Sequence, residues 1–592
     1  MSLLADLSVL LERAPGFAKA NAALREGEDF ALALPSSIRP LVVASLFRAA
    51  PRAVLVAVSG EDAADRFARQ LTAYLPIESV LPLPAPAALP WSRGPGDVRV
   101  TGRRAHALYA LQEGRPAIVV ASARGLMRLL PPRGASEAFA PFVLENGATL
   151  DLEDATDLLA RMGYERVEVA EDPGQFAVRG GTLDVYPSDG HFPVRAELLG
   201  DVIESLRRYV PSTGQSVGDI ALVEAYPCRE IRLSNRTAKD VSQSHRSGFK
   251  DLQRRSLAEP ALAHELELLE QGVYFDGVEV YLPYVYRELA SVTDYLAKTA
   301  LVAVAEPRTV FDDMTRAWAE FQESAAAAEE DVARHFVSPA KLDLGGRQRL
   351  TMLSVLRAGV TADAELLARR PDVAGGESKT VAGLKGLVDS GHTVLMVARD
   401  RRQRESLATS LAHGGLPVAT YAGVGHAVPG SERDVPGGLT ARVVNLGVAD
   451  VPAGFVIPDA RMAIVSVDDA YPHASRRSQG SVDPASLTFD FKPGDYVVHS
   501  THGIALFREM TRREVLGAER DYLLLEYAKG DRLFVPVDQL ERVTKYVGPD
   551  QTAPRVTRLN TADWSGPTYF VTFSSCSTGT NSRSPFAYSR SR

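Results

Sequence analysis

The chain has 592 residues, of which 45% are hydrophobic and 24% charged, a composition typical of soluble globular proteins, and its length predicts about four domains. Sixty-six basic and 74 acidic residues give a formal net charge of −8, which excludes a broadly basic nucleic-acid-binding body and leaves only local contacts with DNA. Two cysteines, and no apolar run near the roughly 20 residues of a membrane helix, argue against a disulfide framework, a zinc site or a membrane protein and favour a reducing cytoplasm.

The first predicted strand and helix flank a loop in the position of a nucleotide-binding phosphate loop. Residues 29–34 are typical of a strand and residues 39–50 of an apolar helix. A working loop, G-x-x-x-x-G-K-[ST], uses glycines for close backbone approach, a lysine for the β- and γ-phosphates and a hydroxyl for magnesium. On that frame the second glycine is Ile38, the lysine is Arg39 and the hydroxyl residue is Pro40. We therefore expect no cofactor at the degenerate loop of Ser36, Ser37, Ile38, Arg39 and Pro40.

The next part of the chain alternates short apolar runs with helical patterns. These segments are residues 53–59, 61–74, 103–112, 117–122 and 123–130. Such alternation predicts a parallel sheet covered on both faces, with the proline-rich residues 81–95 as a surface excursion. From residue 150 to 225 the pattern changes to short strands separated by Gly-Gly, Pro-Ser-Asp-Gly and Gly-Asp, which predicts a small antiparallel domain of hairpins.

The remaining segments predict further domains. Residues 270–305 return to strand and helix, which indicates that the first domain is completed after an insertion, and an Ala/Glu-rich helix follows at 311–336. Residues 345–480 favour another α/β unit, and 491–548 alternate with period two, as in a β-barrel of about five strands. Residues 565–592 contain no Asp, Glu, Lys, Leu or Ile, so we expect them to be disordered.

Two further nucleotide-like features have simpler interpretations. The Lys379-Thr380 pair suggests a second phosphate loop, but Ser378 replaces its glycine, and a helix start capped by Ser378 is favoured. Asp468 and Asp469 follow an apolar strand as magnesium-holding acids do, but no phosphate loop complements them. No Ser/His/Asp or Cys/His constellation is apparent, so we assign no catalytic or metal-binding residues.

Residues 193–199 of the hairpin domain suggest a docking patch. Strand alternation places Arg195, Glu197 and Leu199 on one face, opposite the apolar core positions. Arg179 precedes Gly180-Gly181, where a bulge could turn it toward the same face. An exposed leucine beside arginines predicts a protein-docking patch, although ordinary surface remains the alternative.

Two blocks of sequence resemble one bacterial family. The block GQFAVRGGTLDVYP…PVRAELLGDVIESLRRYVPSTGQS resembles the damage-binding repair protein UvrB and, more tightly, the UvrB-like front of the transcription-repair coupling factor. The block FKPGDYVVHSTHGIALF…RDYLLLEYAKGDRLFVPV resembles that factor's RNA-polymerase-interacting domain, shared with CarD-type regulators. With the degenerate phosphate loop at the front, the chain resembles the coupling factor family over residues 1–564.

The resemblance implies partners and site residues. Family members bind stalled RNA polymerase, displace it with an ATP- and magnesium-dependent double-stranded DNA translocase, and recruit UvrA. The UvrA-binding residues of the family match Arg179, Arg195 and Leu199. At the position of Leu199 the relatives often have an aromatic residue. An edge strand that binds the polymerase β subunit matches Glu509, Met510, Thr511, Arg512 and Arg513. Contact with double-stranded DNA is expected to be weak or indirect, and contact with a membrane is not expected.

The expected fold class is a multi-domain α/β protein. A degenerate RecA/UvrB-like α/β domain holds an inserted antiparallel β domain, and a second small α/β domain, an SH3/Tudor-like β-barrel and a disordered tail follow. The predicted domains are 1–145 (UvrB-like 1a), 146–228 (UvrA-binding β domain), 229–345 (UvrB-like 1b and exit helix), 346–485 (small α/β domain), 486–550 (polymerase-interacting CarD-like barrel) and 551–592 (tail).

The family pattern ends at Ala562-Asp563-Trp564, after which the expected charged helix and motor lobes do not follow. We therefore expect a motorless, non-catalytic adaptor in the bacterial cytoplasm, nucleoid-associated when engaged, that needs no ATP. The alternatives are an ATP-dependent translocase like the full-length family and an inhibitor that occupies polymerase without removing it.

Overall fold

The structure is a computed structural model that describes residues 3–92, 94, 96–133, 138–233, 247–286, 288–342, 344, 346–354, 362–421, 438–451, 453–470, 494–499, 503–515, 518–528, 531–536 and 543–545. The chain forms two compact units, Met1–Ser475 and Arg476–Arg592. The tail predicted to be disordered, residues 551–592, lies outside the described residues. None of the described helices is both long enough and apolar enough to cross a bilayer.

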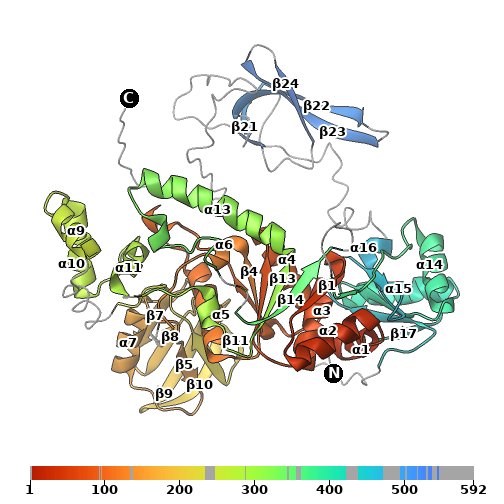
Figure 1. Ribbon diagram of the computed structural model, residues 1–592, viewed down its shortest axis with the longest axis horizontal. Helices are drawn as coiled ribbons and strands as arrows, with labels where there is room; N and C mark the ends of the chain where they lie inside the picture. Colours follow the sequence, from red (N-terminus) through yellow and green to blue (C-terminus); the bar gives the residue numbers. More distant parts are fainter. Residues whose placement is uncertain are drawn as a thin grey trace. The chain divides into compact units, whose positions relative to one another are not determined.

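A seven-stranded parallel sheet is the centre of the first unit (Figure 1). Its strands, in sheet order, are β15 (Ala364–Glu365), β1 (Phe30–Ala33), β14 (Gln348–Leu353), β13 (Leu301–Ala305), β2 (Val54–Val58), β4 (Ile118–Ser122) and β3 (Val80–Leu83). All residues of β2, β4 and β13 are buried, as their uninterrupted apolar sequences require when both sheet faces are covered. The predicted parallel sheet and its completion after an insertion are confirmed.

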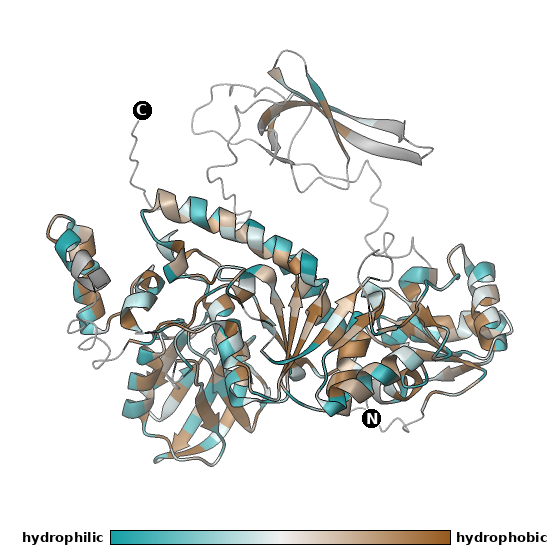
Figure 2. Cartoon of the chain, viewed as in Figure 1, coloured by the Kyte–Doolittle hydropathy of each residue, from teal (hydrophilic) through white to brown (hydrophobic). Residues whose placement is uncertain are grey.

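Helices cover both faces of this sheet, so that apolar strands lie between amphipathic helices (Figure 2). One face packs against α1 (Leu3–Leu11), α2 (Pro15–Glu26), α3 (Arg39–Ala49) and α4 (Glu61–Leu71). The other packs against α5 (Val98–Glu113), α6 (Ala123–Leu126), α12 (Val292–Tyr295) and α13 (Pro307–Ala327). Alternate residues of β2 point into the two cores: Val54 and Val56 into the first, Leu55 and Ala57 into the second.

The proline-rich residues 81–95 differ from the surface excursion that the sequence predicts. They begin inside β3, which among the described strands pairs only with β4 and is therefore an edge strand of this sheet. Pro82 is tolerated there because its missing N–H would face away from the sheet. Leu83 and Trp91 are buried, so this segment belongs partly to the core.

The inserted domain is a six-stranded sheet in which the last five strands pair antiparallel, as predicted, whereas the first strand pairs in parallel with the second. Its strands are β6 (Glu165–Arg166), β7 (Gln175–Arg179), β8 (Thr182–Val185), β9 (Val194–Leu199), β10 (Val202–Tyr209) and β11 (Ser216–Asp219), in the spatial order β11-β10-β9-β8-β7-β6. Leu183 and Ala196 on its inner face pack with Leu159 of α7 (Leu152–Arg161). A separate pair, β5 (Phe142–Glu145) and β12 (Leu222–Ala225), flanks this sheet in sequence, and its residues belong to the same core.

Four helical segments lead back to α12 and β13. They are α9 (Ser247–Ser256), α10 (Pro260–Gln271), the short η4 (Val278–Tyr281) and α11 (Leu282–Val285). After β13 and α13 the chain adds β14 and β15 to the first sheet. These strands lie within residues 346–485, which the sequence assigns to the next domain. The reason is that β14 pairs between β13 and β1, a long-range pairing that no local pattern reveals.

The second α/β sheet has the order β17-β18-β16-β20-β19. The strands are β16 (Thr393–Ala398), β17 (Val418–Thr420), β18 (Val444–Val448), β19 (Phe455–Ile457) and β20 (Met462–Ser466), packed with α14 (Glu377–Asp389), α15 (Arg401–His413) and α16 (Val467–Ala470). The predicted helix start near Ser378 is present, but its N-cap residue is Gly376 and not Ser378. Gly376 has a φ of 98°, which a side-chain-bearing residue rarely adopts.

The second unit contains a five-stranded antiparallel sheet in the order β24-β23-β22-β21-β25. Its strands are β21 (Tyr496–His499), β22 (Gly503–Val515), β23 (Ala518–Glu526), β24 (Arg532–Pro536) and β25 (Val543–Lys545). The period-two alternation therefore predicts these strands correctly. Among the described residues the edge strands β24 and β25 do not pair, so closure into a barrel stays a prediction.

Candidate functional site

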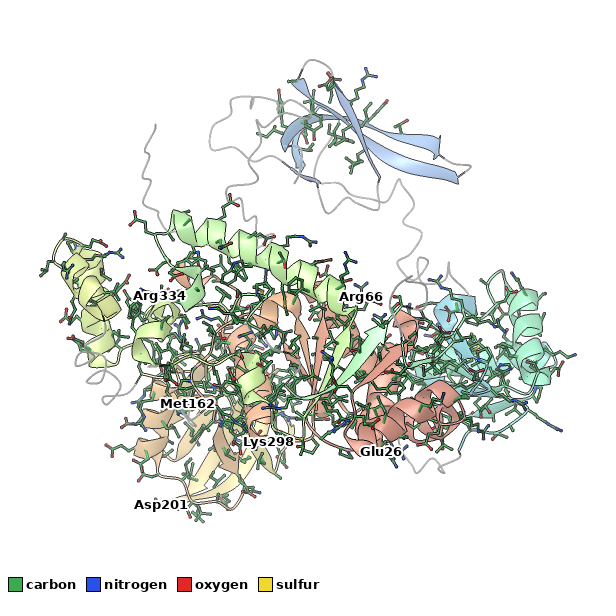
Figure 3. All side chains as sticks on the ribbon, in the orientation of Figure 1. Glu26, Arg66, Met162, Asp201, Lys298 and Arg334 are labelled. Carbon is green, nitrogen blue, oxygen red and sulfur yellow. The ribbon has the colours of Figure 1, made fainter. Side chains whose placement is uncertain are left out.

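The degenerate phosphate loop lies at the carboxyl ends of the parallel strands, where open α/β sheets bind ligands. A cavity of about 770 Å³ lies there, and its lining includes residues at the ends of β2 and β13 and the loop residues Ser36, Ser37 and Arg39. Arg66 of α4, labelled in Figure 3, is part of the same lining. Ile38 is fully buried and its backbone N–H donates to the Pro35 carbonyl oxygen, and Pro40, the second residue of α3, has neither an N–H nor a hydroxyl, so neither residue can donate to a phosphate.

Arg39, which occupies the lysine position of the loop, is engaged inside the protein. Its guanidinium donates a hydrogen bond to the Glu306 carboxylate and a second, of 3.4 Å, to the Ser354 hydroxyl. The Ser354 hydroxyl donates to the same Glu306 carboxylate at 2.5 Å. Glu306 links β13 to α13 with a φ of 55°, a left-handed conformation that costs a residue other than glycine on the order of 1–3 kcal/mol. The carboxylate of Glu306 thus neutralises the cation that a phosphate would need.

The outer face of the six-stranded sheet contains the three residues predicted to dock UvrA. The side chain of Arg179 is 53% exposed and that of Arg195 is 23% exposed. Leu199, at the end of β9, is 71% exposed. The structure therefore places the predicted residues on an accessible face, and the two arginines come from different strands, β7 and β9.

A buried acid joins the two arginines. The side chain of Asp184 on β8 is only 1% exposed. Its carboxylate accepts hydrogen bonds from Arg195 Nε at 2.7 Å and from Arg195 Nη2 at 2.6 Å. It also accepts a hydrogen bond of 3.2 Å from Arg179 Nη2. One carboxylate therefore holds both guanidinium groups, and the hydrogen bonds to it raise the pKa of Arg195.

An aromatic ring supports Arg195 from β10. The guanidinium carbon of Arg195 lies 4.9 Å from the ring centroid of Tyr209, a cation–π contact. Burial raises the pKa of Tyr209 to about 12, so the phenol is neutral at pH 7. The Arg195 side chain is consequently fixed by a salt bridge at one edge and by a ring at one face.

The tip of the hairpin between β9 and β10 exposes apolar side chains. Leu199 pairs with Val202 across a turn in which Gly200 has a φ of 64°, and Asp201 at this turn is labelled in Figure 3. Val202 is also exposed. Leu199 lies about 13 Å along the strand from Arg195, at about 3.3 Å per residue, so any partner that contacts both must cover the strand's length.

Sequence reasoning missed Asp184, Tyr209 and Val202. A signal for Asp184 exists: it is an acidic residue at an alternating position of a predicted strand, which is unusual unless it is paired. Its pairing partner could not be known before the register between β8 and β9, which sets Asp184 opposite Arg195. Val202 directly follows the predicted Gly-Asp turn, so hairpin geometry alone places it beside Leu199.

The predicted polymerase-binding residues lie on β22. Glu509 is exposed and Thr511 is half-buried, whereas the side chains of Met510, Arg512 and Arg513 lie outside the described residues. Residues 503–506 of β22 pair with β21, and residues from 506 onward pair with β23. In the part of the second unit that the structure describes, residues 509–515 thus have a strand on one side only, and their other backbone edge is unpaired.

The strand-end acids of the second α/β sheet are used internally. Asp468 accepts two hydrogen bonds from Arg399 Nη2, at 2.8 and 2.6 Å. Asp469 accepts from the backbone N–H groups of Gly454 and Ser466, and burial raises the pKa of this carboxyl. Within the described residues, no group of three or more His, Cys, Asp and Glu side chains could hold a metal ion. Both acids therefore have a local structural explanation.

Known proteins resemble the chain in two domains and along most of its length. Residues 142–230 match the family model of the UvrB interaction domain, and residues 491–547 match that of the CarD-like/TRCF RID domain. The chain is 30% identical to the transcription-repair-coupling factor of Mycobacterium bovis, over 91% of this chain and 46% of that protein. The corresponding values are 29%, 90% and 46% for the factor of Myxococcus xanthus, and 22%, 94% and 48% for that of Bacillus subtilis.

The chain spans about half the length of the curated relatives it matches. The predicted resemblance to transcription-repair coupling factors is confirmed for this half, and it includes both blocks from which the resemblance was inferred.

Proposed function

We propose that this chain is an adaptor of transcription-coupled nucleotide excision repair that binds RNA polymerase and recruits UvrA. The observation that carries the proposal is the presence of a UvrB interaction domain and a CarD-like/TRCF RID domain in one polypeptide. An adaptor needs two separate docking surfaces, and the two domains lie in different compact units of the chain.

The UvrA-docking surface is the outer face of the six-stranded sheet, with Arg179, Arg195 and Leu199 as its contacts. Arginines that are held in place lose little conformational freedom on binding, and Arg is enriched among residues that dominate interface energies. The exposed apolar pair at the hairpin tip adds area that water leaves on binding. These features support binding to a partner surface with acidic and apolar groups.

The test compares a charge reversal on this face with one elsewhere in the first unit. Arg195→Glu should weaken the affinity for purified UvrA at least tenfold, measured by titration calorimetry. Arg316→Glu is the matched control, because Arg316 is an exposed arginine of α13 that pairs with Asp313 outside this sheet, and we expect at most a twofold change. If the unaltered chain does not bind UvrA, or if the Arg195→Glu variant binds UvrA as tightly as the unaltered chain does, the docking proposal is wrong.

The polymerase-docking surface is the unpaired edge of β22 at residues 509–515. An exposed strand edge offers a row of backbone N–H and C=O groups, with which a strand of the polymerase β subunit can extend the sheet. Main-chain hydrogen bonds supply affinity in this mode, and the side chains of Glu509, Met510, Thr511, Arg512 and Arg513 supply specificity.

Proline scanning tests this edge. Successive N–H groups of a strand point to opposite edges, so proline at 510, 511 and 512 removes inward and outward donors in turn. The variants that retain the far-ultraviolet circular dichroism spectrum of the parent should lose polymerase β binding in a pull-down. If every folded proline variant still binds polymerase, edge pairing is excluded.

We further propose that this chain binds no ATP at Ser36–Ile38 and Arg39 and contacts duplex DNA only weakly or indirectly. The ion pair of Arg39 with Glu306 supports the first statement and the net charge of −8 supports the second. The alternative is an ATP-dependent DNA translocase that displaces stalled polymerase. An ATPase assay with duplex DNA and polymerase separates the two, because turnover above background would favour the translocase.

A further inference from the structure

Three charged side chains on the proposed docking face, the outer face of the six-stranded sheet, are joined by hydrogen bonds: those of Arg179, Asp184 and Arg195. Asp184 lies between Arg179 and Arg195 and accepts hydrogen bonds from both. Two positive charges against one negative charge leave a net charge of +1. Because Asp184 is almost wholly buried and the arginines reach solvent, a partner can touch the cations and not the acid.

The geometry restricts which donors remain available. Arg195 uses Nε and one Nη2 hydrogen on Asp184, so only the rest of its five N–H donors can reach a partner. The bidentate pair fixes the plane of the guanidinium, and the Tyr209 ring covers one of its faces. Arg179 makes a single hydrogen bond to the same carboxylate and keeps the greater exposure.

We propose that Asp184 is a positioning residue of the docking surface, which holds Arg179 and Arg195 in a fixed mutual arrangement that fits acidic side chains on UvrA. This inference rests on the proposed UvrA-docking function. Without the carboxylate both long side chains would sample many rotamers, and binding would have to order them at a cost in conformational entropy.

A simpler role for Asp184 makes different predictions. If the acid only neutralised the patch, removing its charge would raise the positive potential and strengthen binding to an acidic partner. If it only stabilised the domain, its removal would weaken binding equally whether or not the arginines were present. The positioning role requires that the effect of Asp184 passes through the arginines.

The experiment is a double-mutant cycle with UvrA binding as its readout. Asp184→Asn should weaken the affinity about tenfold in the otherwise unaltered chain. In the Arg179→Ala, Arg195→Ala background the same substitution should change the residual affinity less than twofold. Asp313→Asn is the matched control, since Asp313 of α13 pairs with Arg316 outside the six-stranded sheet, and we expect less than a twofold effect.

A second variant keeps the test decisive if Asp184→Asn does not fold. Arg195→Lys retains the charge but cannot form a bidentate pair with Asp184, so we expect about a tenfold loss of affinity. Unchanged or tighter binding by Asp184→Asn, an equal loss in the arginine-free background, or full binding by Arg195→Lys would each overturn the positioning role.

These outcomes differ from a failure of the proposed function. If UvrA does not bind the unaltered chain, or if Arg195→Glu binds normally, docking itself is wrong. If Arg195→Glu abolishes binding while Asp184→Asn leaves it intact, docking stands and only the positioning role falls.

Discussion

Two arginine–carboxylate pairs in the first unit have opposite burial. At the degenerate phosphate loop the side chain of Arg39 is 8% exposed and that of its partner Glu306 is 16% exposed. On the docking face Arg195 is 23% exposed and its partner Asp184 is 1% exposed. In the first pair the cation is the more buried member, and in the second pair the anion is.

The difference shows how one interaction can close a site or present one. An arginine buried against an acid has its charge neutralised within the protein, and here the acid, Glu306, also has a left-handed backbone conformation. An acid buried beneath arginines leaves their outer donors free and restricts their motion. The two pairs therefore differ in which member is buried: the cation at the degenerate loop and the anion at the candidate binding surface.

The largest expected effect comes from a third acid, Glu230. In its ion pairs both the acid and the arginines are buried. It accepts hydrogen bonds from Arg104 at 2.5 Å and Arg128 at 3.1 Å, and both arginine side chains are 1% exposed. Glu230→Gln should lower the free energy of unfolding by about 3–5 kcal/mol, because two buried cations lose their counter-charge. Glu224→Gln is the control, since its partner Arg115 reaches water, and its loss in urea titration should be about 1 kcal/mol or less.

The acid dependence of stability should differ in the same variant. Burial opposes ionisation of Glu230, but the charges of Arg104 and Arg128 outweigh it and lower the pKa of this carboxyl. A carboxyl with a lowered folded-state pKa stabilises the fold above its unfolded pKa of about 4.3 and loses that contribution as pH falls through the folded value. The parent should therefore lose its advantage over Glu230→Gln below about pH 4, and a constant difference down to pH 3 would contradict this.

Glu306→Gln should have the next largest effect. Removing the charge leaves Arg39 buried without a full partner, so we expect a loss of about 3 kcal/mol in the free energy of unfolding. Affinity for UvrA should stay within a factor of two, because the loop and the docking face belong to different sheets. If Glu306→Gln were as stable as the parent, the ion pair between Arg39 and Glu306 would not be what holds the degenerate loop in place.

Asp184→Asn should have the opposite effects to Glu306→Gln: it should weaken UvrA binding but destabilise the chain only slightly. Because Arg179 and Arg195 reach solvent, water can replace their lost hydrogen bonds, and we expect a loss of about 1 kcal/mol in thermal or urea unfolding. A loss as large as that of Glu306→Gln would mean that Asp184 is primarily a structural acid, and the comparison between the two pairs would fail.

The smallest effect is expected at the hairpin tip. Leu199→Phe should leave the free energy of unfolding within about 0.5 kcal/mol, since the side chain is largely exposed. It should strengthen UvrA binding several-fold by enlarging the apolar contact beside Val202. Leu257→Phe, at another exposed leucine, is the control and should not alter affinity. Equal effects of the two substitutions would remove Leu199 from the docking surface.

Sequence patterns predicted much of the fold and part of the candidate site. Alternation along residues 193–199 assigned Arg195 and Leu199 to the outer face, and uninterrupted apolar runs identified β2, β4 and β13 as strands of a covered parallel sheet. Proline hid the edge strand β3, because the rule against proline in strands applies to paired N–H groups and not to a free edge.

The sequence by itself determined the period of each segment, the face on which each strand residue lies, and the chemistry that the degenerate loop lacks, because these follow from neighbouring residues. Only the tertiary structure decided that Arg39 meets Glu306, which is 267 residues away, and that Asp184 lies beneath two arginines. Strand order and register determine which of these side chains come into contact, and both depend on how whole sheets and helices pack. Local propensity fixes the elements, whereas long-range packing selects the partners of each charge.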